Sequence, residues 1–370
     1  MIKPWLFEFF RAPTEKGVLI QSPRAGVTPA DVADQFASFW EMWTRAEGYG
    51  FEGIFFSEHH FGPGYSPSPN LLIAALAPVT SKLRLGVMGM VLPYYQPWRV
   101  IEEIGMLDHL TRGRLEVGTA AGIPPEMAKV GLGVVEANER NLEALEILDW
   151  ALAHPGEPVT HHGKYWDFEN LTLVPMPSQR PSPNRWTTVV SEASARRAAW
   201  RGTRICTGFS SVEQVQKVFG GYREEAGKAG LAVSEDLLGL RRIIMVDRDG
   251  GKARDLAAQV EEQVRNMFLK HDDKVNHGPV PDAPQKSHGG IPLSSDEFIA
   301  GSPVEVADLI AAQCEATGAG HLLAMLDNHG GPAENRVAFD LFAQEVVPLL
   351  RQANVGGEGR HALEATNEQV

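Results

Sequence analysis

Cysteine is scarce in this 370-residue chain, which contains only Cys206 and Cys314. Two cysteines are too few for a disulfide framework, and no four Cys and His residues have zinc-finger spacing. The first residues lack the apolar core of a signal peptide, and no apolar run approaches the ~20 residues that a membrane span requires. We therefore expect a cytoplasmic protein that is neither secreted nor membrane-spanning.

Positive charge is also in short supply. Lys and Arg total 34, against 47 Asp and Glu, which gives a formal net charge of −13 at pH 7. Such a surface repels the phosphates of nucleic acids and anionic lipid head groups over most of its area. Nucleic acids and membrane surfaces are therefore not expected as partners.

Apolar residues, in contrast, make up 43% of the chain, and short apolar runs alternate with amphipathic stretches from end to end. Strands are expected at residues 5–10, 53–57, 83–93, 115–119, 186–191, 205–209, 240–246 and 321–326. Helices are expected at residues 31–49, 71–79, 97–109, 136–153, 195–201, 212–229, 251–271, 303–317 and 335–351. Eight strands, each followed by a helix and with no polar linker between halves, predict an α/β fold, a single (β/α)8 TIM barrel.

Two insertions and one tail depart from this alternation. Residues 159–174 are typical of a hairpin, with Tyr165 and Trp166 on one arm. Residues 272–301 are rich in Gly, Pro, Ser and His, and we interpret them as a mobile lid in preference to a disordered insertion. We therefore predict one barrel domain over residues 1–353 and a frayed C-terminal tail over residues 354–370.

The residues that close the barrel strands are the first candidates for chemistry, because active sites of such barrels lie at the C-terminal ends of the strands. The second strand is followed by Glu58, His59, His60 and Phe61. An imidazole there can act as an acid or a base near neutral pH. The alternatives are a contribution to a zinc site and simple hydrogen bonding. We expect no metal, because the first strand ends Phe7–Phe10 without a His-x-His pair.

Two further strand ends have distinctive compositions. The fourth strand closes with small residues, Gly118 to Gly122, which leave room either for a flat ligand or for a tight turn. The fifth leads through Ser191, Ser194 and Arg196 into a helix, where hydroxyls and N–H groups attract an anion such as phosphate; Ser191 or Ser194 serving only as an N-cap is the alternative. No Gly-x-Gly-x-x-Gly follows the first strand, which argues against a Rossmann nicotinamide site.

Several segments in a fixed order carry a resemblance to one family. They are Glu58–Phe61, Gly86–Pro93, Leu107–Leu115 running into Gly118–Gly122, Glu139–Glu143, Gly301–Val306 and Phe339–Pro348. Together they resemble the bacterial luciferase-like flavin monooxygenases over nearly the whole chain, from Trp5 to Arg351. The resemblance implies a barrel that takes reduced FMN (FMNH2) from a separate flavin reductase. It also implies that O2 adds at the flavin C4a position and that the resulting peroxide oxygenates an organic substrate.

Residue by residue, the resemblance implies that His59, with Glu58 beside it in sequence, is catalytic. Met88 and Gly89 match the place where family members carry a non-proline cis peptide against the flavin ring. Arg140 matches a phosphate-binding arginine, which Ser191 and Ser194 would assist.

This sequence departs from the light-emitting members at Ala120 and Ala121, where they have a cysteine and an arginine. Arg196 is the candidate that replaces the lost charge at the flavin phosphate. Light emission is not expected.

Three matters stay open at this level. A deazaflavin-dependent oxidoreductase on the same barrel, or a non-catalytic flavin-binding protein, is an alternative to the FMN monooxygenase. The expected pocket suggests a small apolar substrate without identifying it, and its residues are Phe9, Phe10, Phe61, Tyr65, Tyr94, Tyr95 and residues of the lid. The resemblance also implies a homodimer, or a heterodimer with a related subunit, formed through the second and third helices.

Overall fold

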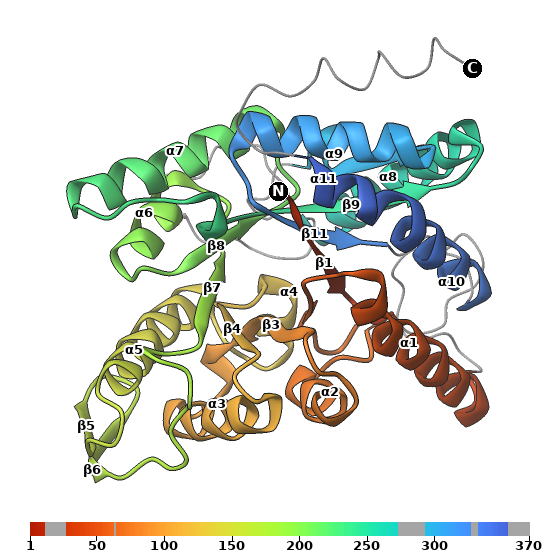
Figure 1. Cartoon of the computed structure of the whole chain (residues 1–370). Helices are drawn as coiled ribbons and strands as arrows, with labels where there is room; N and C mark the ends of the chain where they lie inside the picture. The colour runs from red at the N-terminus through yellow and green to blue at the C-terminus, as the bar shows by residue number, and fades with distance from the viewer. Residues whose placement is uncertain (12–26, 63, 273–292, 327–331, 354–370) are drawn as a thin grey trace.

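A computed structural model describes residues 1–11, 27–62, 64–272, 293–326 and 332–353 of the chain. Eight parallel strands form a closed barrel (Figure 1). They are β1 (Lys3–Glu8), β2 (Gly53–Phe56), β3 (Arg84–Val91), β4 (Leu115–Ala120), β7 (Asn184–Thr188), β8 (Arg204–Thr207), β9 (Leu238–Val246) and β11 (His321–Met325). The ring closes because β9 pairs with both β8 and β11, and β11 pairs with β1. The predicted (β/α)8 fold is confirmed.

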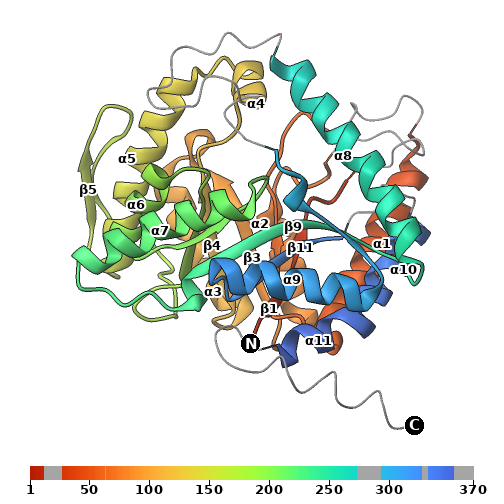
Figure 2. The same cartoon turned by 90° about the horizontal axis from the view of Figure 1, so that it is seen from above.

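Helices surround this ring, as the view from above shows (Figure 2). Those of eight or more residues are α1 (Pro29–Tyr49), α2 (Pro69–Leu76), α3 (Pro97–Thr111), α5 (Val134–Ala153), α6 (Glu192–Trp200), α7 (Val212–Lys228), α8 (Gly250–Asp272), α9 (Pro303–Thr317) and α10 (Pro332–Leu341). A short helix, α4 (Pro124–Lys129), precedes α5. A π-helical stretch, Phe342–Val346, separates α10 from α11 (Val347–Gln352), so the single helix predicted over residues 335–351 is interrupted.

Local sequence signals explain where individual helices begin and end. The side chain of Thr28 accepts a hydrogen bond from the Asp31 N–H, and Asp31 bonds back to the Thr28 N–H, which forms a capping box at the start of α1. Gly50 ends the same helix with a φ of 86°, a conformation that glycine adopts without steric cost. None of the described helices is both long and apolar enough to cross a bilayer.

The insertions are only partly as expected. The hairpin is confirmed, since β5 (Val159–His162) and β6 (Asp167–Leu171) pair antiparallel. The predicted lid, residues 272–301, is wrong at its C-terminal end: Phe298–Gly301 forms β10, which pairs parallel with β9. Four residues after a Gly- and Pro-rich stretch show no usable periodicity, and only pairing with β9 makes them a strand. Residues 273–292 and the predicted tail, residues 354–370, lie outside the described part of the chain.

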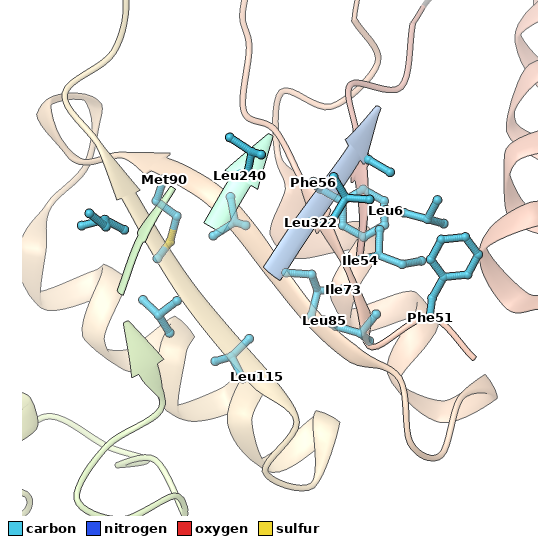
Figure 3. Close-up of a cluster of buried hydrophobic side chains, with 14 of the residues drawn as sticks. Leu6, Phe51, Ile54, Phe56, Ile73, Leu85, Met90, Leu115, Leu240 and Leu322 are labelled. Atoms are coloured by element: carbon cyan, nitrogen blue, oxygen red, sulfur yellow. The ribbon is translucent and has the colours of Figure 1, made fainter. Parts of the chain in front are cut away.

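Apolar side chains fill the space on both sides of the strands. Leu6, Ile54, Leu85 and Leu322 belong to the large cluster that packs strands against helices (Figure 3). A second cluster comprises Trp5, Phe55, Met88, Trp186, Cys206 and Leu323, with Phe7 packed against it. These residues alternate along their strands with those of the first cluster, so they face the barrel interior.

Candidate active site

The loop after β2 carries the first candidate carboxylate, Glu58, whose side chain is fully buried. Its Oε1 lies 3.1 Å from Nε2 of His60, and its Oε2 lies 3.4 Å from the Val91 backbone nitrogen. The hydrogen bond to Glu58 raises the pKa of His60. Burial raises the pKa of Tyr95, and the nearby Glu58 carboxylate raises it further. Glu58 therefore contacts His60 and Val91, the last residue of β3.

His59 is paired with a carboxylate that sequence reasoning missed. Its Nδ1 lies 2.9 Å from Oε1 of Glu126, a residue of α4 that is only 7% exposed. The imidazole also packs against the ring of Phe9, with 4.8 Å between the ring centroids. Nε2 of His59 has no hydrogen-bond partner among the residues that the structure describes. One sequence feature could have pointed to Glu126: it lies in the first turn of a helix that begins with two prolines just beyond the fourth strand.

Strand alternation does not separate the two histidines, because β2 already ends at Phe56. Both therefore lie in the loop, and Phe61 turns that loop with a φ of 58°. His60 packs edge-on against Tyr94, with 5.5 Å between ring centroids. Two imidazoles, two carboxylates and two tyrosines therefore lie close together at the ends of β2, β3 and β4.

The expected non-proline cis peptide is present between Met88 and Gly89. The pairing of β3 with β4 shifts register at this point. A Cβ on Gly89 would lie 2.6 Å from the backbone of Thr119, and one on Gly118 would lie 2.1 Å from the Val87 carbonyl oxygen. Both glycines are therefore needed for the close approach of the two strands, whether or not a ligand lies there.

The predicted phosphate-binding residues are brought together only in part. Arg140 on α5 is paired with Glu136 at 2.8 Å and lies over the ring of Tyr165 at 4.8 Å. Ser191 is the N-cap of α6 and forms a capping box with Ser194.

Arg196 is ion-paired on the α7 side in this structure. Its guanidinium contacts Glu224 at 2.6 Å and Glu225 at 3.2 Å, both on α7. This pairing draws the side chain toward α7. Ala120, the other predicted residue, ends β4 half-exposed next to the register shift.

Helices α5 and α6 run side by side around the barrel. Asp149, near the end of α5, is ion-paired with Arg185 of β7 and, at 3.0 Å, with Arg201, the C-cap of α6. Since both helices follow neighbouring barrel strands, their N-terminal halves lie at the same end of the barrel as His59. Arg140 and the Ser191 cap therefore belong to the same face of the molecule as the histidines. No group of three metal-ligating side chains occurs among the described residues.

Comparisons with known proteins agree with this architecture. The sequence profile described as luciferase-like monooxygenase matches residues 14–321. An uncharacterised protein, y4wF of Sinorhizobium fredii, is 34% identical over 79% of this chain and 85% of its own length. The oxygenase component of the flavin-dependent trigonelline monooxygenase of Acinetobacter baylyi is 25% identical over 87% of this chain and 91% of its own.

Solved structures show the same fold. The monooxygenase RslO1 of Streptomyces bottropensis has a TM-score of 0.75 and 24% identity, covering 94% of this chain and 99% of its own. The oxygenating constituent of 3,6-diketocamphane monooxygenase of Pseudomonas putida, in complex with FMN, has a TM-score of 0.71 and 22% identity, covering 95% and 99%. An F420-dependent secondary alcohol dehydrogenase has a TM-score of 0.67 and 18% identity, covering 95% and 99%.

Proposed function

Since the chain belongs to the luciferase-like monooxygenase family, we propose that it is the oxygenase component of a two-component, FMN-dependent monooxygenase. The observation that carries the proposal is the His59–Glu126 pair at the mouth of the barrel. Reduced FMN supplies the chemistry when bound, because it reacts with O2 and delivers one oxygen atom to an organic substrate.

The described residues fit such a cofactor. Met88 and Gly89, with the small side chain of Ala120 at the end of the neighbouring strand, offer a flat surface for an aromatic ring. The cationic side chain of Arg140 and the N–H groups at the start of the nine-residue helix α6 offer a phosphate site. Ser191 and Ser194 lie at that start. Arg196 would join the site only by leaving its two carboxylates on α7.

His59 is the residue that we propose to handle protons. Donation of its Nδ1 hydrogen to the Glu126 carboxylate selects the tautomer whose Nε2 carries a free lone pair. That nitrogen can take a proton from a reacting group, while Glu126 holds the imidazole in place. His60 and Glu58 support the loop, and Glu58 additionally ties it to Val91. This assignment moves Glu58 from a catalytic role to a positioning role.

Aromatic side chains near the mouth indicate a small, largely apolar substrate. Phe9 packs on His59, Phe61 is 55% exposed, and Tyr94 packs on His60. A deazaflavin-dependent oxidoreductase is the second candidate, because an F420-dependent enzyme shares the fold. The word "component" in the name of the Acinetobacter relative supports a separate reductase as partner.

The proposal is tested by mixing the purified protein with reduced FMN and O2 in a stopped-flow spectrophotometer. We expect the return of oxidised-flavin absorbance to be delayed relative to free reduced FMN, because the site shields the flavin from water. Reduced deazaflavin is the matched control. Identical reoxidation with and without protein, or binding of the deazaflavin alone, would contradict the proposal.

A further inference from the structure

A buried arginine, Arg241, stands out inside the barrel because the proposed chemistry does not use it. It lies on β9 and is 8% exposed. Its guanidinium carbon is 5.5 Å from the ring centre of Phe7 and 3.9 Å from that of Phe209. Phe7 packs against the interior cluster of the barrel. A cation is therefore held between two aromatic rings inside the barrel.

The hydrogen-bonding capacity of Arg241 is only partly used. Its Nη2 donates to Oε1 of Glu297 at 2.5 Å, but Nη1 meets only the sulfur of Met325 at 3.7 Å, a weak acceptor. Gly208 makes room for the side chain, since a Cβ there would lie 2.5 Å from Nε. In the described part of the chain, Nη1 thus lacks the oxygen acceptor that a buried guanidinium normally has.

The charge of Arg241 is also incompletely balanced. Glu297, which is fully buried, is shared with Arg242 at 3.2 Å and with the Phe209 N–H at 2.6 Å. One carboxylate therefore serves two guanidiniums. Arg242 is fully buried on the outer side of the sheet, where the Asp296 carboxylate also attracts its charge. Nη2 of Arg242 also has no hydrogen-bond partner among the described residues, but of the two guanidiniums only that of Arg241 contacts Phe7, which packs against the interior cluster.

Strand β1 connects this cation to the proposed reaction centre. Phe7 contacts Arg241, and Phe9, two residues further along, contacts His59. β1 ends at Glu8, so Phe9 lies just beyond the end of the strand that carries Phe7. We place the substrate along these two rings, with one end at His59 and the other at Arg241.

We infer that the otherwise apolar substrate carries an organic anion, a carboxylate or a sulfonate, which binds Arg241. The inference rests on the proposed function, because it concerns the substrate of that site. An anion supplies the acceptor that Nη1 lacks and the charge that Glu297 does not supply. The aromatic rings of Phe7 and Phe209 then exclude water from the ion pair.

The test uses three probes of one shape: p-toluate, p-toluenesulfonate and the neutral p-toluamide. Each is titrated calorimetrically into the purified full-length protein, with and without FMN. We expect the protein to bind at least one anion about tenfold or more tightly than the amide, and Arg241→Gln to abolish that preference. Arg242→Gln is the matched control, because it disrupts the same Glu297 cluster from the outer side. Arg242→Gln should change the ratio of anion affinity to amide affinity by no more than a factor of about two. Comparing p-toluate with p-toluenesulfonate shows which acid the site favours.

The inference is overturned if the parent protein prefers neither anion over the amide, or if both arginine variants lose the preference equally. It is also overturned if Arg241→Gln weakens FMN binding while the anion preference persists. Should Arg241→Gln fail to fold, Arg241→Lys replaces it and is expected to retain part of the preference, because it keeps the charge but not the planar fork. Anion binding through Arg241 without any effect of the protein on flavin reoxidation would contradict the proposed function and not this inference.

Discussion

His59 and His60 are neighbours in the chain, but they are bound by different carboxylates, Glu126 and Glu58. Because His59 has a free Nε2, we expect His59→Ala to fold and bind FMN but to lose at least ~100-fold in turnover, about 2.7 kcal/mol of transition-state stabilisation. His60→Ala should lose less. Single-turnover product yield with reduced FMN and a true substrate measures both effects. A His59 variant with near-parent rates would contradict the assignment.

Glu126 should act through His59. We expect Glu126→Gln to lower turnover by roughly 10- to 100-fold, the usual cost of losing a partner that orients an imidazole, with an unchanged FMN dissociation constant. The ¹⁵N chemical shifts of the His59 ring, which report its tautomer, should change in this variant. Lys129→Met, on the same helix, is the control that leaves the pair intact. Unchanged shifts would show that Glu126 does not select the tautomer.

We expect substitutions of Arg140 and Arg196 to have different effects on the affinity for reduced FMN. Arg140→Ala should weaken reduced-FMN binding by roughly 10- to 150-fold, because a charge-assisted hydrogen bond contributes about 1.5 to 3 kcal/mol. Arg196→Ala should leave it nearly unchanged, since Glu224 and Glu225 already hold this guanidinium. Anaerobic flavin titration distinguishes them. Loss of affinity in the Arg196 variant alone would place the phosphate nearer α7.

At the level of secondary-structure elements, α2 and α3 present unusual apolar exposure. Leu71 on α2 is 71% exposed, and Met106 and Leu110 on α3 are 55% and 50% exposed. Met106 and Leu110 are four residues apart and so share one helix face. Because adjacent exposed apolar side chains favour association, we propose that this face forms the contact of a homodimer or of a heterodimer with a related subunit.

The substitution Met106→Glu/Leu110→Glu should convert a dimer into a monomer, because charged side chains at the core of an interface are costly to bury. Light scattering coupled to size-exclusion chromatography measures the mass. Val337→Glu, on α10 and 69% exposed, is the control and should not change it. A parent chain that is already monomeric at micromolar concentration would refute the homodimer and leave only the related-subunit alternative.

The stability of the whole molecule should depend on pH through His321, at the base of the barrel. Its Nδ1 accepts a hydrogen bond from the Trp5 indole at 2.8 Å, and Nε2 lies 3.2 Å from the Asp236 carbonyl oxygen. Burial lowers the pKa of His321 to about 3. Protonation would break the bond to Trp5, so the folded state holds the neutral imidazole.

The unfolded chain, with a His pKa near 6.5, binds a proton that the folded chain does not bind between pH 6.5 and about 3. The free energy of unfolding should therefore fall as the pH drops below 6.5, by about 2 kcal/mol at pH 5 from this group alone. His321→Gln should reduce this loss. Urea denaturation at pH 7 and pH 5 measures it, and equal losses in parent and variant would show that other groups cause the acid sensitivity.

Much of the architecture could be predicted from local patterns. Each strand and helix of the barrel shows its own periodicity, and signals such as Thr28–Asp31 mark where a helix begins. The strand ends that form the mouth follow directly, because all parallel strands of a barrel end on one face. The position of His59 and the small residues near Gly118 could therefore be identified without coordinates.

Contacts between side chains that are distant in the sequence are decided only in the folded chain. Glu126 is 67 residues from His59, and Glu224 is 28 from Arg196; neither contact has a local pattern. The strand at Phe298–Gly301 exists because β9 continues beyond Leu240, where its pairing with β8 ends, and pairs with this segment through Ile243–Val246. The same holds for Arg241, whose neighbours come from β1, β11 and the segments around Phe209 and Glu297. Periodicity reports the environment of one element, whereas ion pairs and sites are made between elements, and their distances are set only by packing.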